Sequence, residues 1–146
     1  MAAGNVVVYL TGIDQTMRQS INWASNTFMV ALCSHGYTPN YSSHSDWDTD
    51  VSIYELTTSG YAERQLQNQS VDPTASNSHI GFDADDITFS ATATMTAKYA
   101  VVYHQTTNQL LCYVDLETGT TSGVDATQIV VQWNANGLFR INHSGT

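Results

Sequence analysis

Apolar residues recur at every second position over much of the chain, and this period constrains the fold more than any other feature of the sequence. A period of two places alternate side chains on opposite faces of a strand, whereas a helix needs apolar residues three and four apart. In FMVALC, for example, Phe28, Val30 and Leu32 fall on one face. Similar runs rich in β-branched and aromatic residues are VSIYELT (51–57), DITFSA (86–91), AKYAVVYHQ (97–105), QLLCYVDL (109–116), TQIVVQW (127–133) and LFRIN (138–142).

The remaining signals complete the expected architecture. A hairpin turn is expected at residues 106–108, and the polar stretch 67–78 predicts a surface loop. Only residues 12–21 have helical spacing, with Ile13, Met17 and Ile21 four residues apart. About eight or nine short strands and one short N-terminal helix predict an all-β fold, an antiparallel β-sandwich or jelly roll, in a single domain over residues 1–146.

Charge argues against polyanionic partners. The net charge is -9, from 13 Asp and Glu against 4 Lys and Arg, and the basic residues are scattered singly. We therefore expect no nucleic acid and no membrane as partners, since both would need a basic surface. The N-terminal stretch has no basic region before its short apolar run, so we expect neither a secretory signal nor a membrane span.

Both cysteines lie within apolar runs, FMVALC and LLCYV. A disulfide would need an oxidising compartment, for which the sequence shows no address. We therefore predict that Cys33 and Cys112 are buried free thiols rather than a disulfide.

The acidic stretch DWDTD could hold a cation, because Asp46, Asp48 and Asp50 occupy positions one, three and five of a potential calcium loop. The loop then lacks the glycine needed at position six, where Val51 stands, and the glutamate needed at position twelve, where Thr57 stands. If the segment is extended, its three carboxylates line one edge before the next strand, where they would bind a cation weakly or keep sheets from pairing. We favour a solvated edge, and whether a cation binds stays open.

No other group of residues forms a catalytic motif. The acids of Asp83–Asp86 predict a turn rather than an acid-base pair, because a tight turn offers no cleft. The histidines, at positions 35, 44, 79, 104 and 143, lack metal-ligand spacing, and no nucleophile elbow or phosphate loop is present. A Ser-His-Asp triad could still form from distant residues, but no motif points to one. We predict no catalytic, cofactor-binding or metal-binding residues, no cofactor and no enzyme activity.

The three tryptophans have different expected roles. Trp23 and Trp133 adjoin predicted strands and are expected to pack in the core or at strand ends. Trp47 lies between two aspartates and is expected to be exposed. An exposed tryptophan of this kind suits an interface anchor better than a sugar platform.

Several longer stretches resemble small tailed-phage virion structural proteins. The similar stretches are INWASNTFMVALCSHGYTPN (21–40), SGYAERQL (59–66), DADDITFSA (83–91), AVVYHQTTNQLLCYVDL (100–116) and IVVQWNANGLFRI (129–141). Two stretches depart from the family pattern: NVVVYL (5–10) reads as a strand where the family has part of a helix, and DWDTD is more acidic than the usual loop.

The resemblance implies a structural role and offers no catalytic residues to transfer. We expect a capsid decoration, or cement, protein that binds the outer face of the head and bridges major capsid subunits, in a virion assembled in the host cytoplasm. The expected partner is the major capsid protein, and the expected assembly is a cyclic homo-oligomer, a trimer at three-fold positions. The alternative is a phage tail or adsorption component with lectin-like binding to host surface glycan, suggested by Trp47 and the 8 tyrosines.

Overall fold

The computed structural model of the chain describes residues 4–76, 79–134 and 137–142. Residues 47–54, called the helical segment below, form a π-helical turn (Trp47–Val51) followed by a 3-10 turn (Ser52–Tyr54). The other elements, in chain order, are β1 (Val6–Val8), α1 (Leu10–Met17), β2 (Phe28–Cys33), β3 (Arg64–Gln65), β4 (Ser70–Ser76), β5 (His79–Asp83), β6 (Ile87–Ala97), β7 (Tyr99–His104), β8 (Leu110–Asp115), β9 (Val124–Val131) and β10 (Phe139–Asn142).

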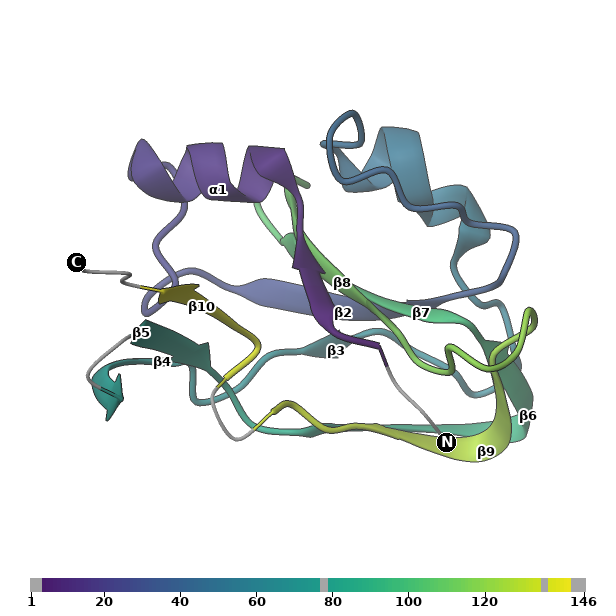
Figure 1. The fold of residues 1–146 in the computed structure, drawn as a ribbon. Coiled ribbons are helices and arrows are strands. Elements are labelled where there is room, and N and C mark those ends of the chain that lie inside the picture. The colour runs from purple at the N-terminus through teal and green to yellow at the C-terminus, as the bar shows by residue number, and fades with distance from the viewer. Residues whose placement is uncertain (1–3, 77–78, 135–136, 143–146) are drawn as a thin grey trace.

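The strands form three antiparallel sheets. A five-stranded sheet has the order β1-β8-β7-β2-β3, a three-stranded sheet the order β10-β5-β4, and β6 pairs with β9 in a two-stranded ribbon. In Figure 1 the β6–β9 ribbon lies below the five-stranded sheet, while α1 and the helical segment cover the opposite face of that sheet. The predicted fold class is confirmed: the protein is an all-β antiparallel sandwich with a short N-terminal helix.

The five-stranded sheet is buried on both faces, so the protein has two hydrophobic clusters. The sandwich cluster lies toward the β6–β9 ribbon and includes Phe28, Val30 and Leu32 of β2. The helical-side cluster includes the alternate residues of the same strand, Met29, Ala31 and Cys33. It also includes Trp47 and other residues that lie beneath α1 and the helical segment. The strand alternation predicted for FMVALC is therefore confirmed, and both of its faces are apolar because both are covered.

The two cysteines belong to different clusters. Cys33 lies in the helical-side cluster and Cys112 in the sandwich cluster, and both are free and buried. Burial raises the pKa of each thiol well above its ordinary value. The prediction of buried free thiols is confirmed.

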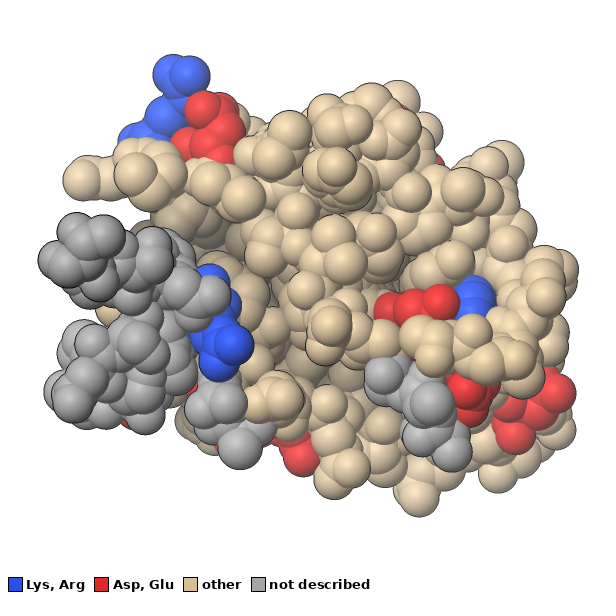
Figure 2. All heavy atoms as spheres, in the orientation of Figure 1, with Lys and Arg blue, Asp and Glu red and all other residues tan. Residues whose placement is uncertain are grey.

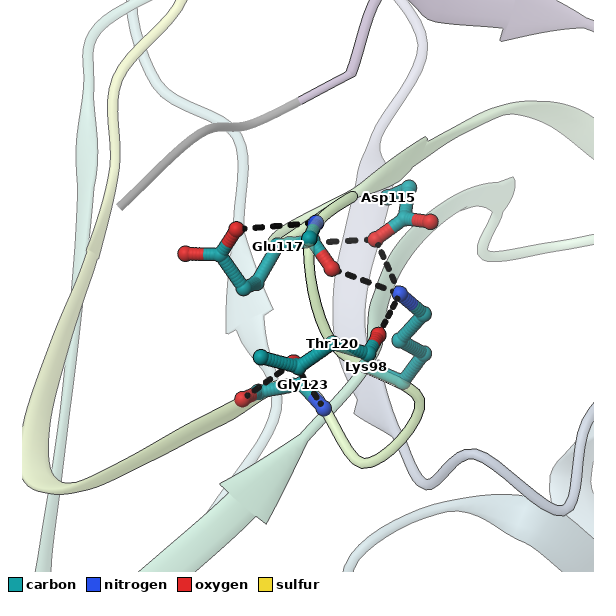
Figure 3. A network of polar contacts seen from close by, with 6 residues as sticks. Lys98, Asp115, Glu117, Thr120 and Gly123 are labelled. Carbon is teal, nitrogen blue, oxygen red and sulfur yellow. Dashed lines mark hydrogen bonds and ion pairs between the residues drawn. The ribbon is translucent and has the colours of Figure 1, made fainter.

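One charged side chain is buried beside the connection from β8 to β9. Lys98 is 7% exposed. Its Nζ pairs with Asp115 Oδ1 at 2.9 Å and donates hydrogen bonds to the carbonyls of Glu117 and Thr120, each at 2.6 Å. Figure 3 shows Asp115, at the end of β8, and the carbonyls of Glu117 and Thr120, in the loop that follows, converging on the lysine amine. Lys98 lies between β6 and β7 and therefore fastens this loop to the start of β7.

Most strand predictions are confirmed, but two local predictions are wrong. The segment VSIYELT is not a strand, because its first residues complete the helical segment: Val51 is buried while Ile53 is 84% exposed. The predicted surface loop 67–78 contains β4, which pairs with β5. The register is interrupted between Asp72 and Ser76, where the sequence has a proline without an amide hydrogen. Residues 77–78 of that prediction lie outside the described residues.

The predicted N-terminal helix is present, with its bounds shifted from 12–21 to Leu10–Met17. It lies close against β8, because a Cβ added at Gly12 would approach the Leu111 carbonyl oxygen to 2.7 Å. Glycine is therefore needed at this position for the helix to reach the sheet. Among the described residues, no helix is both long and apolar enough to cross a membrane.

Candidate interaction surfaces

The DWDTD stretch forms a turn instead of the predicted extended edge. Asp46 caps the turn, since its Oδ1 accepts a hydrogen bond from the Thr49 amide at 3.0 Å. Asp50 Oδ2 accepts from the amides of Ser45 at 2.8 Å and Asp46 at 3.0 Å. Two of the three carboxylates therefore bind the backbone of their own turn, which is the ordinary capping role of aspartate.

Trp47 points inward from this turn, and the prediction that it is exposed is wrong. It is 5% exposed, and its ring stacks on Tyr103 with centroids 4.4 Å apart and an interplanar angle of 5°. Its amide donates to the Asn108 carbonyl at 2.7 Å, and Asn108 Nδ2 donates to Asp48 Oδ2 at 2.6 Å. The segment thus docks on the β7–β8 hairpin turn, which is present at the predicted position.

The third carboxylate, Asp48, consequently binds the hairpin turn rather than joining Asp46 and Asp50 around a common point. Within residues 4–76, 79–134 and 137–142, no group of three or more His, Cys, Asp or Glu side chains is placed to hold a metal ion. The function of DWDTD in this structure is to shape a turn and attach it to the sheet.

We expect the Asp50→Ala variant to lose about 1 kcal/mol of unfolding free energy at pH 7, as is usual for loss of a capping carboxylate. Burial acts to raise the pKa of Asp50, but the hydrogen bonds from the Ser45 and Asp46 amides and the charge of His44 together lower it below its ordinary value. Because the pKa of Asp50 is lower in the folded state than in the unfolded state, its ionised carboxylate stabilises the protein at pH values above the ordinary aspartate pKa. This stabilisation is lost as the pH falls through the pKa of the folded state.

Urea denaturation of Asp50→Ala and the unmodified chain at neutral and acid pH checks this expectation. The difference in unfolding free energy between the two proteins should become smaller below about pH 4. Asp14→Ala is the control, because the contacts of the Asp14 carboxylate with Arg18 and Gln15 are exposed, and we expect a change under about 0.5 kcal/mol. An equal loss in both variants would contradict a capping role for Asp50.

The second acidic group, Asp83–Asp86, does not form the predicted turn: Asp83 ends β5, and residues 84–86 are an irregular connection to β6, which belongs to another sheet. Asp85 Oδ2 accepts from Asn68 Nδ2 at 2.6 Å, and Asp86 Oδ1 accepts from the Trp133 amide at 2.9 Å. Trp133 Nε1 donates in turn to the Asp85 carbonyl at 2.9 Å. These contacts hold the end of β9 against the start of β6.

The described histidines are dispersed. His44 Nδ1 lies 3.0 Å from the Tyr37 hydroxyl, which bonds to the buried Tyr9 hydroxyl at 2.6 Å. His104 is buried and lies 2.6 Å from Thr107 Oγ1. The side chain of His79 and all of His143 fall outside what the structure describes.

Glu55, which the sequence did not single out, has a carboxyl pKa above its ordinary value. Burial raises its pKa, a hydrogen bond from the Tyr61 hydroxyl at 3.1 Å opposes this, and the neighbouring Glu63 adds to it. Glu55 lines an open depression of about 360 Å³ with His35 and several hydroxyl side chains. A raised carboxyl pKa by itself is also found in structural pairs, so it does not define an active site.

The outer face of α1 presents an unusual surface. Leu10, Ile13 and Met17 are 50%, 48% and 74% exposed and lie within one arc of the helix. We call these three residues the apolar ridge. Tyr41, whose carbonyl accepts from the Leu10 amide, and Ile53 of the helical segment are also exposed on the same side of the sheet. Figure 2 shows few charged atoms over this upper surface apart from one adjacent blue and red pair.

A second surface is a groove at the open side of the sandwich. We call it the β1–β9 groove, and its volume is about 760 Å³. Its described lining consists of residues 4–6, Val8, Val114, Leu116, residues 130–134 and residues 137–140. β1 and β9 are both edge strands, so within the described part of the chain no further strand closes the sandwich between them.

Comparison of the chain with protein-family models, curated proteins and solved structures finds no match.

Proposed function

We propose that the protein is a structural component of a phage virion, a capsid decoration protein that binds the outer face of the head and bridges major capsid subunits. The observation that carries this proposal is the apolar ridge. A helix on a sandwich normally turns its apolar side chains toward the sheet, and here Leu10, Ile13 and Met17 face solvent instead.

The close contact of α1 with β8 explains this orientation. Gly12 is the buried residue of the helix, and Thr16 Oγ1 bonds back to the Gly12 carbonyl at 2.7 Å. The sheet-facing side of α1 is therefore small and polar, which leaves no room beneath the helix for the larger residues. The ridge is rigidly presented and available to a partner.

Burial of the ridge would give a substantial contribution to binding. Full burial of an aliphatic side chain is worth about 1.5–3 kcal/mol, so three half-exposed side chains together offer roughly 3–5 kcal/mol before the costs of association. The nearby Asp14–Arg18 pair is already neutralised as a pair, so little uncompensated charge would be desolvated. A surface of this kind suits a protein partner.

The sequence resemblance suggests which partner this is. Stretches between residues 21 and 141 are similar to tailed-phage virion proteins, and a shell offers many equivalent binding positions on the major capsid protein. A ligand of the assembled lattice that does not bind separated subunits shifts the equilibrium toward the shell. Closed trimers would match three-fold positions of such a lattice.

The lectin-like alternative, a tail or adsorption component, has lost its main structural support. It depended on an exposed Trp47, and that side chain is stacked on Tyr103 inside the protein. Trp47 cannot provide a sugar platform without leaving the helical-side cluster.

The test uses purified virions of the phage that encodes the chain. We expect hundreds of copies per particle by quantitative mass spectrometry, and density on the outer face of the head in an icosahedral reconstruction. Only a few copies per particle, or density confined to the tail, would contradict the decoration role and favour the role in adsorption.

A binding assay on heads that lack the protein then tests the ridge. The triple variant Leu10→Ser, Ile13→Ser, Met17→Ser should bind at least about a hundredfold more weakly than the unmodified chain, since a loss of about 3 kcal/mol corresponds to this factor. Val71→Ser is the matched control, because Val71 is an exposed apolar residue on β4 of the three-stranded sheet, outside both the ridge and the groove. Unchanged binding of the triple variant would exclude the ridge as the contact surface.

A further inference from the structure

We propose that the β1–β9 groove binds an extended peptide segment of a partner protein, which pairs as an additional strand with the free edge of β1 and places a carboxylate against Arg140. This inference uses the groove rather than the apolar ridge, and it does not depend on the partner being a capsid protein.

The first observation is the free edge itself. Among the strands that the structure describes, β1 is the outermost of the five-stranded sheet and pairs only with β8. The Tyr9 amide donates to the Leu111 carbonyl at 3.0 Å, and Tyr9 and Val7 are two residues apart, so both direct their backbone groups toward β8. Val6 and Val8 then direct their N–H and C=O groups away from β8. These groups form a ladder to which an extended chain can bind.

The second observation is the apolar lining beside that edge. The side chains of Val6 and Val8 line the groove together with Leu116 and Leu138, which belong to the sandwich cluster. A strand added to β1 would direct every second side chain toward this lining. In Figure 1 the edge strands β1 and β9 border the same open side of the sandwich, where an added strand would complete the cover of the core.

The third observation is the charge of the groove. The described lining contains one cation, Arg140, and no aspartate or glutamate. This is unusual in a chain with 13 acidic residues against 4 basic ones. Arg140 is exposed on β10, where its backbone pairs with Gly81 of β5. A guanidinium at the margin of an apolar groove favours a partner that carries a carboxylate.

These observations together favour a peptide over two other occupants. A fatty acid would satisfy the apolar lining and Arg140, but not the backbone groups of Val6 and Val8. A second copy of β1 could pair with the edge, but the sequence from Gly4 to Tyr9 carries no carboxylate for Arg140. An extended acidic segment satisfies all three features.

The experiment measures binding of a defined peptide pool by fluorescence anisotropy. The pool consists of labelled heptapeptides, threonine-X-threonine-X-threonine-aspartate-threonine, with X drawn from valine, isoleucine, leucine and phenylalanine, and with both ends blocked. The aspartate then lies on the same face of the strand as X. A second pool replaces aspartate by asparagine and leaves the C-terminal carboxylate free, which distinguishes a side-chain carboxylate from a chain terminus.

Backbone methylation of the pool provides the deciding measurement. Methylated amides at one set of alternate positions face β1, and those at the other set face away from it. We expect methylation in one frame to weaken binding about tenfold or more, as for loss of hydrogen bonds worth about 1.4 kcal/mol, and methylation in the other frame to have less than a twofold effect. This comparison leaves the protein unchanged, so it does not depend on whether a variant folds.

The charge contact is tested with two arginine variants. Arg140→Gln should weaken binding of the carboxylate pool by about three- to fivefold, as expected for loss of a partly exposed ion pair. It should not affect a blocked pool without a carboxylate. Arg18→Gln is the matched control, because Arg18 pairs with Asp14 on α1, and it should leave binding unchanged.

Other outcomes would overturn the proposal. Equal effects of the two methylation frames would show that no strand pairs with β1, and absence of saturable binding up to about 1 mM peptide would show that the groove takes no such segment. Saturable binding of decanoate without peptide binding would assign the groove to an amphiphile. Dimerisation that buries the β1 edge at the same concentrations would assign it to a second copy. None of these results bears on the abundance of the protein in virions, so the proposed function is tested separately.

Discussion

The Lys98→Met variant is expected to unfold with a free energy about 2–4 kcal/mol lower than that of the unmodified chain. Methionine retains the length of the side chain but removes the ion pair to Asp115 and both hydrogen bonds to the carbonyls of Glu117 and Thr120. Asp115 keeps the bond that its Oδ1 accepts from the Glu117 amide at 3.0 Å. Because Asp115 is partly exposed, the cost should fall below that of a fully buried unpaired charge.

Urea denaturation of the two proteins measures this difference. Arg18→Met is the matched control: it also replaces a cation that pairs with an aspartate, but both partners are exposed, so we expect a change under about 0.5 kcal/mol. If Lys98→Met were no more destabilising than Arg18→Met, the lysine would not hold the loop.

The unfolding free energy of the Gly123→Ala variant is expected to be about 3–5 kcal/mol lower than that of the unmodified chain, because backbone strain and a steric collision combine. Gly123 has a φ of +96°, which a residue with a Cβ rarely adopts. A Cβ at this position would lie 2.0 Å from the Ala97 carbonyl oxygen, which belongs to β6. The start of β9 would have to move away from β6 to remove this collision.

Gly119→Ala in the same loop is the control for this prediction. A Cβ at Gly119 would meet only the flexible carboxylate of Glu117, at 3.1 Å. We expect its unfolding free energy to stay within about 0.5 kcal/mol of the unmodified value. Similar losses in the two alanine variants, measured by thermal and urea denaturation, would contradict the role assigned to the Gly123 backbone.

The strands could be predicted where burial on both faces left short continuous apolar runs in the sequence. β2, β7 and β8 lie in the middle of the five-stranded sheet, and their apolar runs were recognised. Val51 and Ile53 have the two-residue spacing of a strand, but a helical segment buries one and exposes the other. β4 was missed because its sequence, SVDPTAS, is polar and contains proline, and its pairing with β5 is a tertiary effect that local composition does not encode.

The candidate surfaces could not be predicted for a related reason. The spacing of Ile13 and Met17 indicated a helix, but the direction of its apolar side depends on how closely Gly12 approaches β8. Trp47 looked exposed between two aspartates, although the turn directs it inward and directs the carboxylates to backbone amides. The β1–β9 groove is formed by segments more than a hundred residues apart in the chain, which no local motif could bring together.

The position of the two thiols on opposite faces of one sheet gives each layer of the protein its own chemical probe. Cys33 can react only when the helical layer lifts from the sheet, and Cys112 only when the sandwich opens or β1 and β8 separate from the ribbon. Alkylation under native conditions, read separately at the two sites, therefore reports two distinct opening reactions in a chain that needs no added label. If a partner binds over α1, it should slow the first reaction, and a strand added beside β1 should slow the second.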